Sequence, residues 1–74
     1  MHEEHEEVSV SELWRRDLVS EGEASRMLQL PFSSWRLLKR RSPPPLIALG
    51  KHRRILVADL RAWLTSLREE GGAH

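Results

Sequence analysis

Two proline breaks constrain this chain more than any other feature. At Leu30-Pro31 the proline disfavours helical geometry at the residue before it and suits the first turn of a new helix. Further along, Pro43-Pro44-Pro45 forbids the continuation of a helix and favours a stiff, extended connector. We therefore expect one helix to end near Gln29 and a second helix, beginning around residues 31–33, to end before the triple proline.

Serine-led capping patterns predict two helices ahead of the first break. Ser20 and Glu23 form a capping box, in which each side chain bonds the backbone N–H of the other residue. The residues that follow have the spacing of a buried helical face, namely Ala24, Met27 and Leu28. A weaker match begins at Ser9 and predicts a short helix whose apolar edge is formed by Leu13, Trp14 and Leu18. Trp14 would either pack on the domain or contact a partner.

The helix after the first break is predicted to be two-sided. At about 100° per residue, Trp35 and Leu38 face the core together. The opposite, outward side is formed by Ser33, Arg36, Leu37 and Arg40. Cations at the end of this helix suit the negative end of its dipole.

A hairpin and a last helix are predicted after the triple proline. The β-prone runs 46–49 and 54–57 flank residues 50–53, a short basic link containing glycine that fits a two-stranded hairpin. A helix over residues 58–68 follows, because apolar residues recur at the spacing of one helical face, namely Leu60, Trp63, Leu64 and Leu67. We expect both Trp35 and Trp63 in the core. The predicted fold class is mainly α with a two-stranded β-hairpin.

The charges are distributed unevenly, although the formal net charge is only +1. Residues 1–23 carry eight acidic and two basic side chains, whereas residues 24–68 carry ten basic side chains and one acid, Asp59. A 45-residue segment with a net charge of +9 is typical of a polyanion-binding surface, and nucleic acid is the first candidate. The acidic N-terminal residues would compete with phosphate for that surface, contact a basic partner, or act as a solubilising arm.

Several classes of function find no support in the residues present. The chain has no cysteine, which excludes a disulfide framework and a thiolate metal site. His2 and His5 are three residues apart, whereas the metalloprotease helix motif needs four. The chain has no Gly-rich phosphate-binding loop, and its Ser, His and Asp residues do not occur in the pattern of a catalytic triad. No enzyme is therefore supported. We therefore expect no catalytic residue, metal, cofactor or small-molecule ligand.

The chain also shows no targeting or membrane segment. No apolar run approaches the roughly 18 residues that span a bilayer, and the N-terminus is acidic where a secretory signal would be basic and then apolar. We expect one small cytoplasmic domain with no membrane association, which joins the nucleoid when it is bound to DNA.

Two short helices joined by a tight turn form a helix-turn-helix unit. The second helix would enter the major groove, where Arg36 and Arg40 offer donors to guanine or to phosphates. Ser33 and Ser34 lie near the helix start, where hydroxyl and backbone N–H groups suit a phosphate oxygen. The hairpin would lie along a neighbouring minor groove or its phosphates, with contacts from Lys51, His52, Arg53 and Arg54.

Four segments together resemble the MerR-like winged helix-turn-helix domains of bacteria and phages. They are residues 23–28, residues 33–38, Pro45 with residues 49–55, and residues 59–64. The likeness covers about residues 18–68 and is closest to the small excisionase (Xis) and AlpA-like branch, in which a wing with a Leu-Gly-X-X-Arg core precedes an Asp-Leu-X-X-Trp-Leu helix. It implies a winged helix-turn-helix fold with DNA contacts from the wing and the reading helix. On that helix the expected set is Ser33, Ser34, Arg36, Lys39, Arg40 and Arg41.

The resemblance also sets the expected organisation and function. Residues 1–17 would be an acidic, partly disordered arm, residues 18–68 the DNA-binding domain and residues 69–74 a flexible tail. The implied function is that of an excisionase, a recombination directionality factor that binds double-stranded DNA cooperatively at attachment sites, bends it and assists a tyrosine or serine integrase. Two alternatives stay open, namely a small transcriptional regulator and a protein-binding adaptor whose wing contacts an acidic partner.

Overall fold

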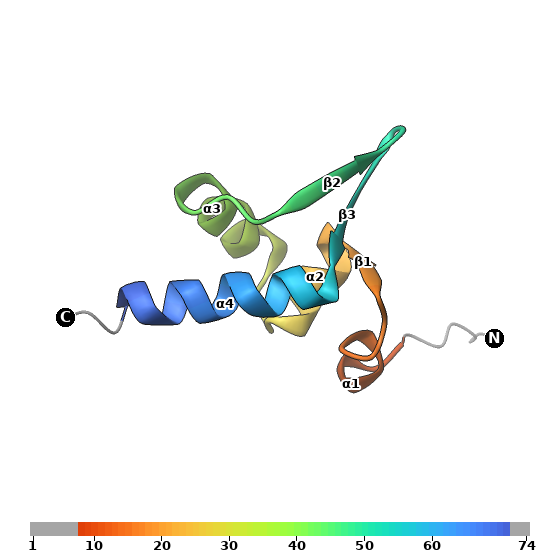
Figure 1. The fold of residues 1–74 in the computed structure, drawn as a ribbon, viewed down its shortest axis with the longest axis horizontal. Helices are drawn as coiled ribbons and strands as arrows, with labels where there is room; N and C mark the ends of the chain where they lie inside the picture. Colours follow the sequence, from red (N-terminus) through yellow and green to blue (C-terminus); the bar gives the residue numbers. More distant parts are fainter. Residues whose placement is uncertain (1–7, 72–74) are drawn as a thin grey trace.

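A computed structural model shows four helices and a three-stranded antiparallel sheet within residues 8–71, the part of the chain that the structure describes (Figure 1). In chain order the elements are α1 (Val10–Leu13), β1 (Leu18–Ser20), α2 (Glu21–Met27), α3 (Phe32–Arg41), β2 (Leu46–Leu49), β3 (His52–Leu56) and α4 (Val57–Gly71). The fold is therefore a small mixed α/β unit. The expectations for residues 1–7, including His2 and His5, and for residues 72–74 lie outside the described residues.

The predicted limits of α2 and α3 are confirmed. Ser20 Oγ accepts from the Glu23 backbone N–H at 3.1 Å, and Glu23 Oε1 accepts from the Ser20 N–H at 2.9 Å, so both halves of the capping box are present. Gln29, just after α2, has a φ of 58°, the left-handed conformation that often ends a helix. Pro31 then precedes α3 as its N-cap residue. The two helices are thus joined by a turn of four residues, 28–31.

The sheet has one strand more than the two-stranded hairpin that the sequence predicted. β3 lies in the centre, and β1 pairs with it on the side opposite β2, with Leu18 facing Leu56 and Val19 facing Ile55. Leu18 is therefore in a strand and does not continue the apolar edge of α1. The physical reason is burial: Val19 is 1% exposed and Ile55 is fully buried, so this pairing places both β-branched side chains in the core.

The hairpin turn is shorter than the sequence predicted. Leu49 pairs with His52, which leaves Gly50 and Lys51 as a two-residue turn. Gly50 has a φ of 63°, which glycine adopts without steric cost and which two-residue hairpin turns require. His52 and Arg53, expected in the link, consequently belong to β3. Val57, expected in the strand, is the first residue of α4.

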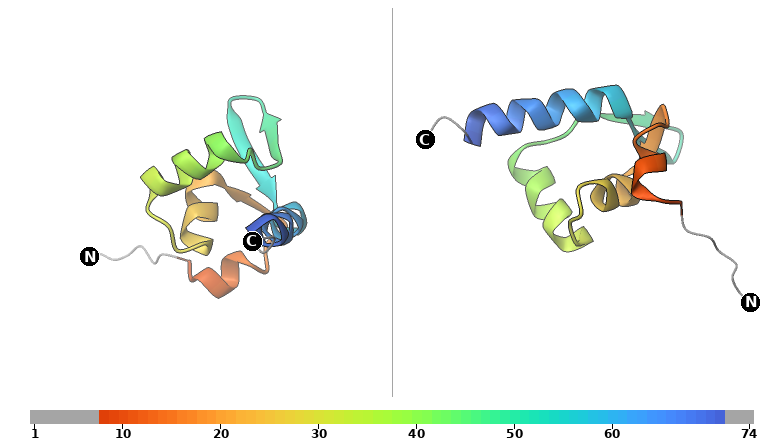
Figure 2. Two further views of the ribbon diagram at one scale, coloured as in Figure 1. Left: turned by 90° about the vertical axis from the view of Figure 1, so that its left-hand side faces the viewer. Right: turned by 90° about the horizontal axis from the view of Figure 1, so that it is seen from below.

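The core lies between the sheet and the helices that surround it. Its buried members are Leu13, Val19, Ala24, Met27, Trp35, Ile55, Val57 and Leu60. Trp35 is fully buried as predicted, whereas Trp63 is only partly buried and packs on the edge of this cluster. Their rings meet edge to face, with centroids 5.8 Å apart and planes at 72°. The C-terminal part of α4 extends past the other elements (Figure 2), and Trp63 lines an open hollow beside the proline connector.

The folded unit begins before residue 18. Leu13 in α1 is fully buried in the same core as α2 and β3. Trp14 also packs on this core, and the Arg61 guanidinium from α4 lies 4.7 Å from its ring centroid and donates to its carbonyl at 3.2 Å. Trp14 therefore packs on the domain, the first of the two alternatives. At the other end, α4 includes residues 69–71, which the sequence placed in the tail.

Candidate nucleic-acid interface

The outward face of α3 is the one that the helical period predicted. Its exposed residues recur at i, i+3, i+4 and i+7, and we call them the α3 stripe: Ser33, Arg36, Leu37 and Arg40. Trp35 is buried on the opposite side of the helix. Arg41 is exposed beside the stripe, whereas Ser34 is only half-exposed. The stripe is thus a regular polar and basic surface with one apolar residue.

Four exposed cations near this surface are free to bind an external anion. Within residues 8–71, no hydrogen bond or ion pair engages the side chains of Arg36, Arg40, Arg41 or Lys51. Other basic residues are already used inside the fold, such as Arg61 at Trp14 and Arg16, which lies 3.3 Å from Glu23. A cation without an internal partner can contact a phosphate or a base edge without first breaking a bond.

The basic residues of the hairpin do not share one face. Successive side chains alternate across a strand, so Arg53 lies on the side of Ile55, while His52 and Arg54 lie on the other side of the sheet. Arg54 is partly buried and donates to the Arg53 carbonyl at 2.9 Å. The four wing residues expected to act together are therefore divided, with Lys51 in the turn between the two faces.

Glu21 joins α3 to the hairpin, a role that the sequence analysis did not foresee. Its Oε1 accepts from Trp35 Nε1 at 3.0 Å and from Lys39 Nζ at 2.7 Å, and its Oε2 lies 3.8 Å from an Arg53 guanidinium nitrogen. The Glu21 side chain is 15% exposed. One carboxylate at the start of α2 thus contacts two residues of α3 and one of β3.

The environment of Glu21 stabilises its charged form. Burial alone raises the pKa of a carboxyl group, but hydrogen bonds from Lys39 and Trp35, together with the charges of Lys39 and Arg53, outweigh it. The pKa of Glu21 consequently lies below its ordinary value of 4.5. Glu21 is ionised at neutral pH and holds Lys39 and Arg53 by charge.

Lys39 therefore occupies a different place from the one expected of it. The resemblance placed Lys39 with Arg36 and Arg40, but its side chain is only 26% exposed and is bound to Glu21. The sequence held a signal for the Trp35–Glu21 contact but not for the Lys39 contact, because a buried indole N–H needs an acceptor and an acid in the first turn of α2 can supply one. Periodicity alone assigns residues to faces and does not reveal such tertiary pairs.

The helix α3 and the hairpin lie on the same side of the molecule. Both α3 and the β2–β3 hairpin lie above α4 in Figure 1 and in the left panel of Figure 2. Glu21 contacts both elements, through Lys39 of α3 and Arg53 of β3. We define the candidate interface as the α3 stripe with Arg41 and, on the hairpin, Lys51 and Arg53.

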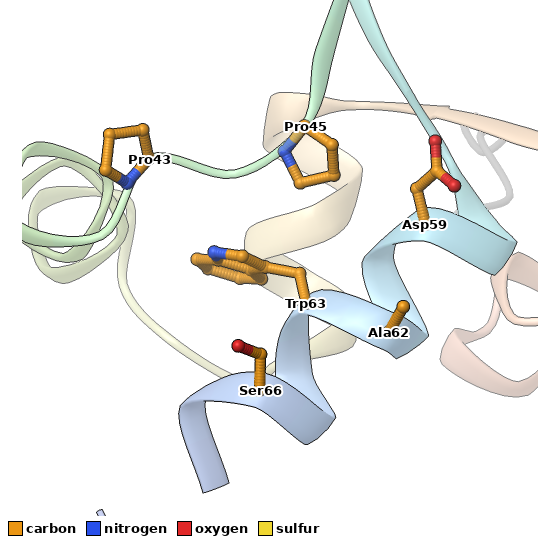
Figure 3. A pocket seen from close by; sticks show the side chains of 6 residues that line it. All are labelled: Pro43, Pro45, Asp59, Ala62, Trp63 and Ser66. Atoms are coloured by element: carbon orange, nitrogen blue, oxygen red, sulfur yellow. The ribbon is translucent and has the colours of Figure 1, made fainter. Parts of the chain in front are cut away.

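A hollow of about 530 Å³ lies elsewhere, between the proline connector and α4 (Figure 3). Its lining is formed by Pro43, Pro45, Asp59, Ala62, Trp63 and Ser66. The Trp63 indole lies under the connector and forms one wall (Figure 3). Asp59 is the one charged residue of this lining, and its negative charge does not suit a polyanion. The lining of this hollow shares no residue with the candidate interface.

Neither a metal cluster nor a membrane span is found in the part of the chain that the structure describes. No three His, Asp, Glu or Cys side chains of residues 8–71 come together in a way that could hold a metal ion. Over the same residues, no helix has the length and apolar character needed to cross a bilayer.

Comparisons with known proteins add no further identification. No protein-family model, curated protein or solved structure matches the chain. The candidate interface is therefore argued from its own residues and geometry.

Proposed function

We propose that this protein binds double-stranded DNA as a MerR-like winged helix-turn-helix domain. In this proposal α2, the turn of residues 28–31 and α3 form the helix-turn-helix, and the β2–β3 hairpin is the wing. α3 enters the major groove with the α3 stripe against the base edges. The observation that carries the proposal is the pair Arg36 and Arg40, which are exposed, one helical turn apart and unpaired within residues 8–71.

The two arginines have the chemistry that the major groove requires. A guanidinium group offers paired donors that match guanine O6 and N7, or two phosphate oxygens. Side chains at i and i+4 lie one above the other on a helix, so Arg36 and Arg40 can contact neighbouring base pairs or the phosphates that flank them. Ser33, exposed in the first turn of α3, is placed to bond a phosphate oxygen.

The Glu21 contacts support joint binding by the helix and the wing. DNA recognition needs the reading helix and the wing at a fixed spacing, and Glu21 connects Lys39 of α3 with Arg53 of β3. Arg53 keeps an exposed guanidinium, with 63% of its side chain accessible, at 3.8 Å from the Glu21 carboxylate. It can therefore reach a phosphate while Glu21 limits its position.

Titration of a fluorescent duplex, followed by anisotropy at low salt, tests the proposal. We expect the wild-type chain to bind. The double variant with Arg36→Ala and Arg40→Ala should lose most of its affinity for the duplexes that the wild type binds. The double variant with Arg15→Ala and Arg68→Ala is the matched control, because it also removes two exposed arginines but leaves α3 and the hairpin intact. Equal loss in the two double variants would mean that only total charge matters and would reject the assignment of α3 as the reading helix.

The biological setting that we propose for this binding is excision of a mobile element. An excisionase would bind attachment-site DNA, bend it and help an integrase to assemble on it. A recombination assay with the cognate integrase tests this setting, and omission of the protein should abolish excision. Unchanged excision together with altered promoter activity would instead favour a small transcriptional regulator that uses the same DNA-binding surface.

A protein-binding adaptor is the second candidate, and one observation favours it. Leu18, Leu49 and Leu56 are 38%, 47% and 37% exposed, and the register places all three on the face of the sheet that carries Arg54. Leu18 and Leu56 are paired neighbours on this face, and adjacent exposed aliphatic side chains are typical of a contact surface. Absence of any measurable duplex affinity at low salt would favour the adaptor.

A further inference from the structure

Leu37 is an apolar residue in the middle of the basic surface of α3. It is 59% exposed, the largest value among the exposed large hydrophobic residues within residues 8–71. The residues that flank it on the helix surface at i±3 and i±4 are all serine or arginine: Ser33, Ser34, Arg40 and Arg41. Phe32, the other exposed apolar residue of α3, is five positions away and faces about 140° around the helix.

This isolation decides what kind of group Leu37 can contact. A protein-docking surface is a contiguous apolar patch, and Leu37 has no apolar neighbour on the exposed side of α3. A single aliphatic side chain surrounded by hydrogen-bond donors instead suits a polar surface that presents one small apolar group. The major groove of DNA is such a surface, because the C5-methyl group of thymine is the apolar group on its base edges.

We propose that Leu37 determines specificity by packing on a thymine methyl group beside the guanine that Arg40 contacts. The inference rests on the proposed DNA-binding function. It adds the identity of one base, thymine, that the α3 stripe recognises. Leu37 and Arg40 are three residues apart, a rise of about 4.5 Å along the helix, compared with about 3.4 Å between successive base pairs. The thymine is therefore placed within one or two base pairs of the position contacted by Arg40.

The test begins with selection of bound sites from a random duplex library by the full chain. The position contacted by Arg40 is identified as the one at which Arg40→Ala relaxes the selected consensus. We expect a thymine within two base pairs of it. That thymine is then replaced by deoxyuridine, which removes the methyl group and leaves every hydrogen-bonding atom in place. Loss of one buried methyl contact should weaken wild-type binding about fourfold.

Leu37→Ala should bind the thymine and deoxyuridine duplexes equally. The substitution is compatible with the fold because Leu37 is largely exposed. Leu67→Ala is the control, since Leu67 is a leucine of α4 outside the candidate interface, and it should keep the fourfold difference. Equal wild-type affinity for the two duplexes, or a difference that survives in Leu37→Ala, would overturn the inference while DNA binding stands. No binding to any duplex would overturn the proposed function and this inference with it.

Discussion

The indole Nε1 of Trp35 donates a hydrogen bond to Oε1 of Glu21 at 3.0 Å. Trp35 is fully buried and Glu21 is mostly covered, so this bond links the largest core side chain to a carboxylate at the base of the candidate interface. The same carboxylate binds Lys39 and lies near Arg53. Core packing and the placement of α3 against the hairpin thus depend on one residue, and this dependence can be measured.

Replacement of Glu21 by alanine should destabilise the fold. The buried Trp35 N–H would lose its acceptor, which costs about 1–3 kcal/mol. Glu21→Gln keeps a carbonyl acceptor and should cost less. Chemical denaturation gives the free energies of unfolding, with Glu69→Ala, an exposed residue of α4, as a control that should change by less than about 0.5 kcal/mol. Equal stability of Glu21→Ala and the wild type would show that the bond contributes nothing.

The stability that the charged Glu21 side chain contributes should decrease as the pH falls. Its pKa in the folded state is lowered by its contacts, so the folded state binds the proton less tightly than the unfolded state. The contribution is therefore complete above the unfolded pKa and is lost as the pH falls through the folded pKa. The difference in unfolding free energy between the wild type and Glu21→Gln, measured from pH 7 down to pH 3, should shrink. A difference that stays constant over this range would contradict the assignment.

The two tryptophans of the edge-to-face pair should contribute unequally. Trp35→Ala removes a fully buried ring and should cost about 3–5 kcal/mol, enough to unfold a domain of this size. Trp63 is only partly buried, so Trp63→Ala should cost clearly less. Trp35→Phe keeps a ring in the core and allows measurement where the alanine variant does not fold. Thermal and chemical denaturation rank the variants, and a larger loss at Trp63 would contradict the packing described here.

The division of hairpin cations between two faces predicts different salt dependences. Lys51→Ala and Arg53→Ala should each reduce the slope of log K against log salt by about 1, because in the proposed complex each side chain contacts one phosphate. Arg54→Ala should leave the slope unchanged, because Arg54 lies on the other face and donates to the Arg53 carbonyl. If all three variants changed the slope alike, the two faces of the hairpin would be equivalent toward DNA.

Local signals in the sequence predicted most of the helical structure. The capping box of Ser20 and Glu23 and the break at Pro31 act within a few residues of themselves, and the structure confirms the helix limits they indicate. The exposed stripe of α3 also follows from a period of 3.6 residues. Its four members were identified without any tertiary information.

Contacts between distant residues could not be obtained in the same way. β1 has three residues, too few to show a two-residue alternation, and Ser20 at its end also caps the next helix. The hairpin link was expected to be two residues longer, and this shift decides the strand positions of His52 and Arg53. Glu21 reaches Lys39 and Arg53 across the fold, and neither pairing leaves a periodic trace in the chain.

The salt dependence of duplex binding by the wild-type chain tests the central claim most directly. If the α3 stripe and Arg41, together with Lys51 and Arg53 of the hairpin, contact about six phosphates, log K should fall linearly against log salt with a slope near −5. Binding that is weak at every salt concentration, or that does not change with salt, would contradict the claim that this surface binds the DNA double helix.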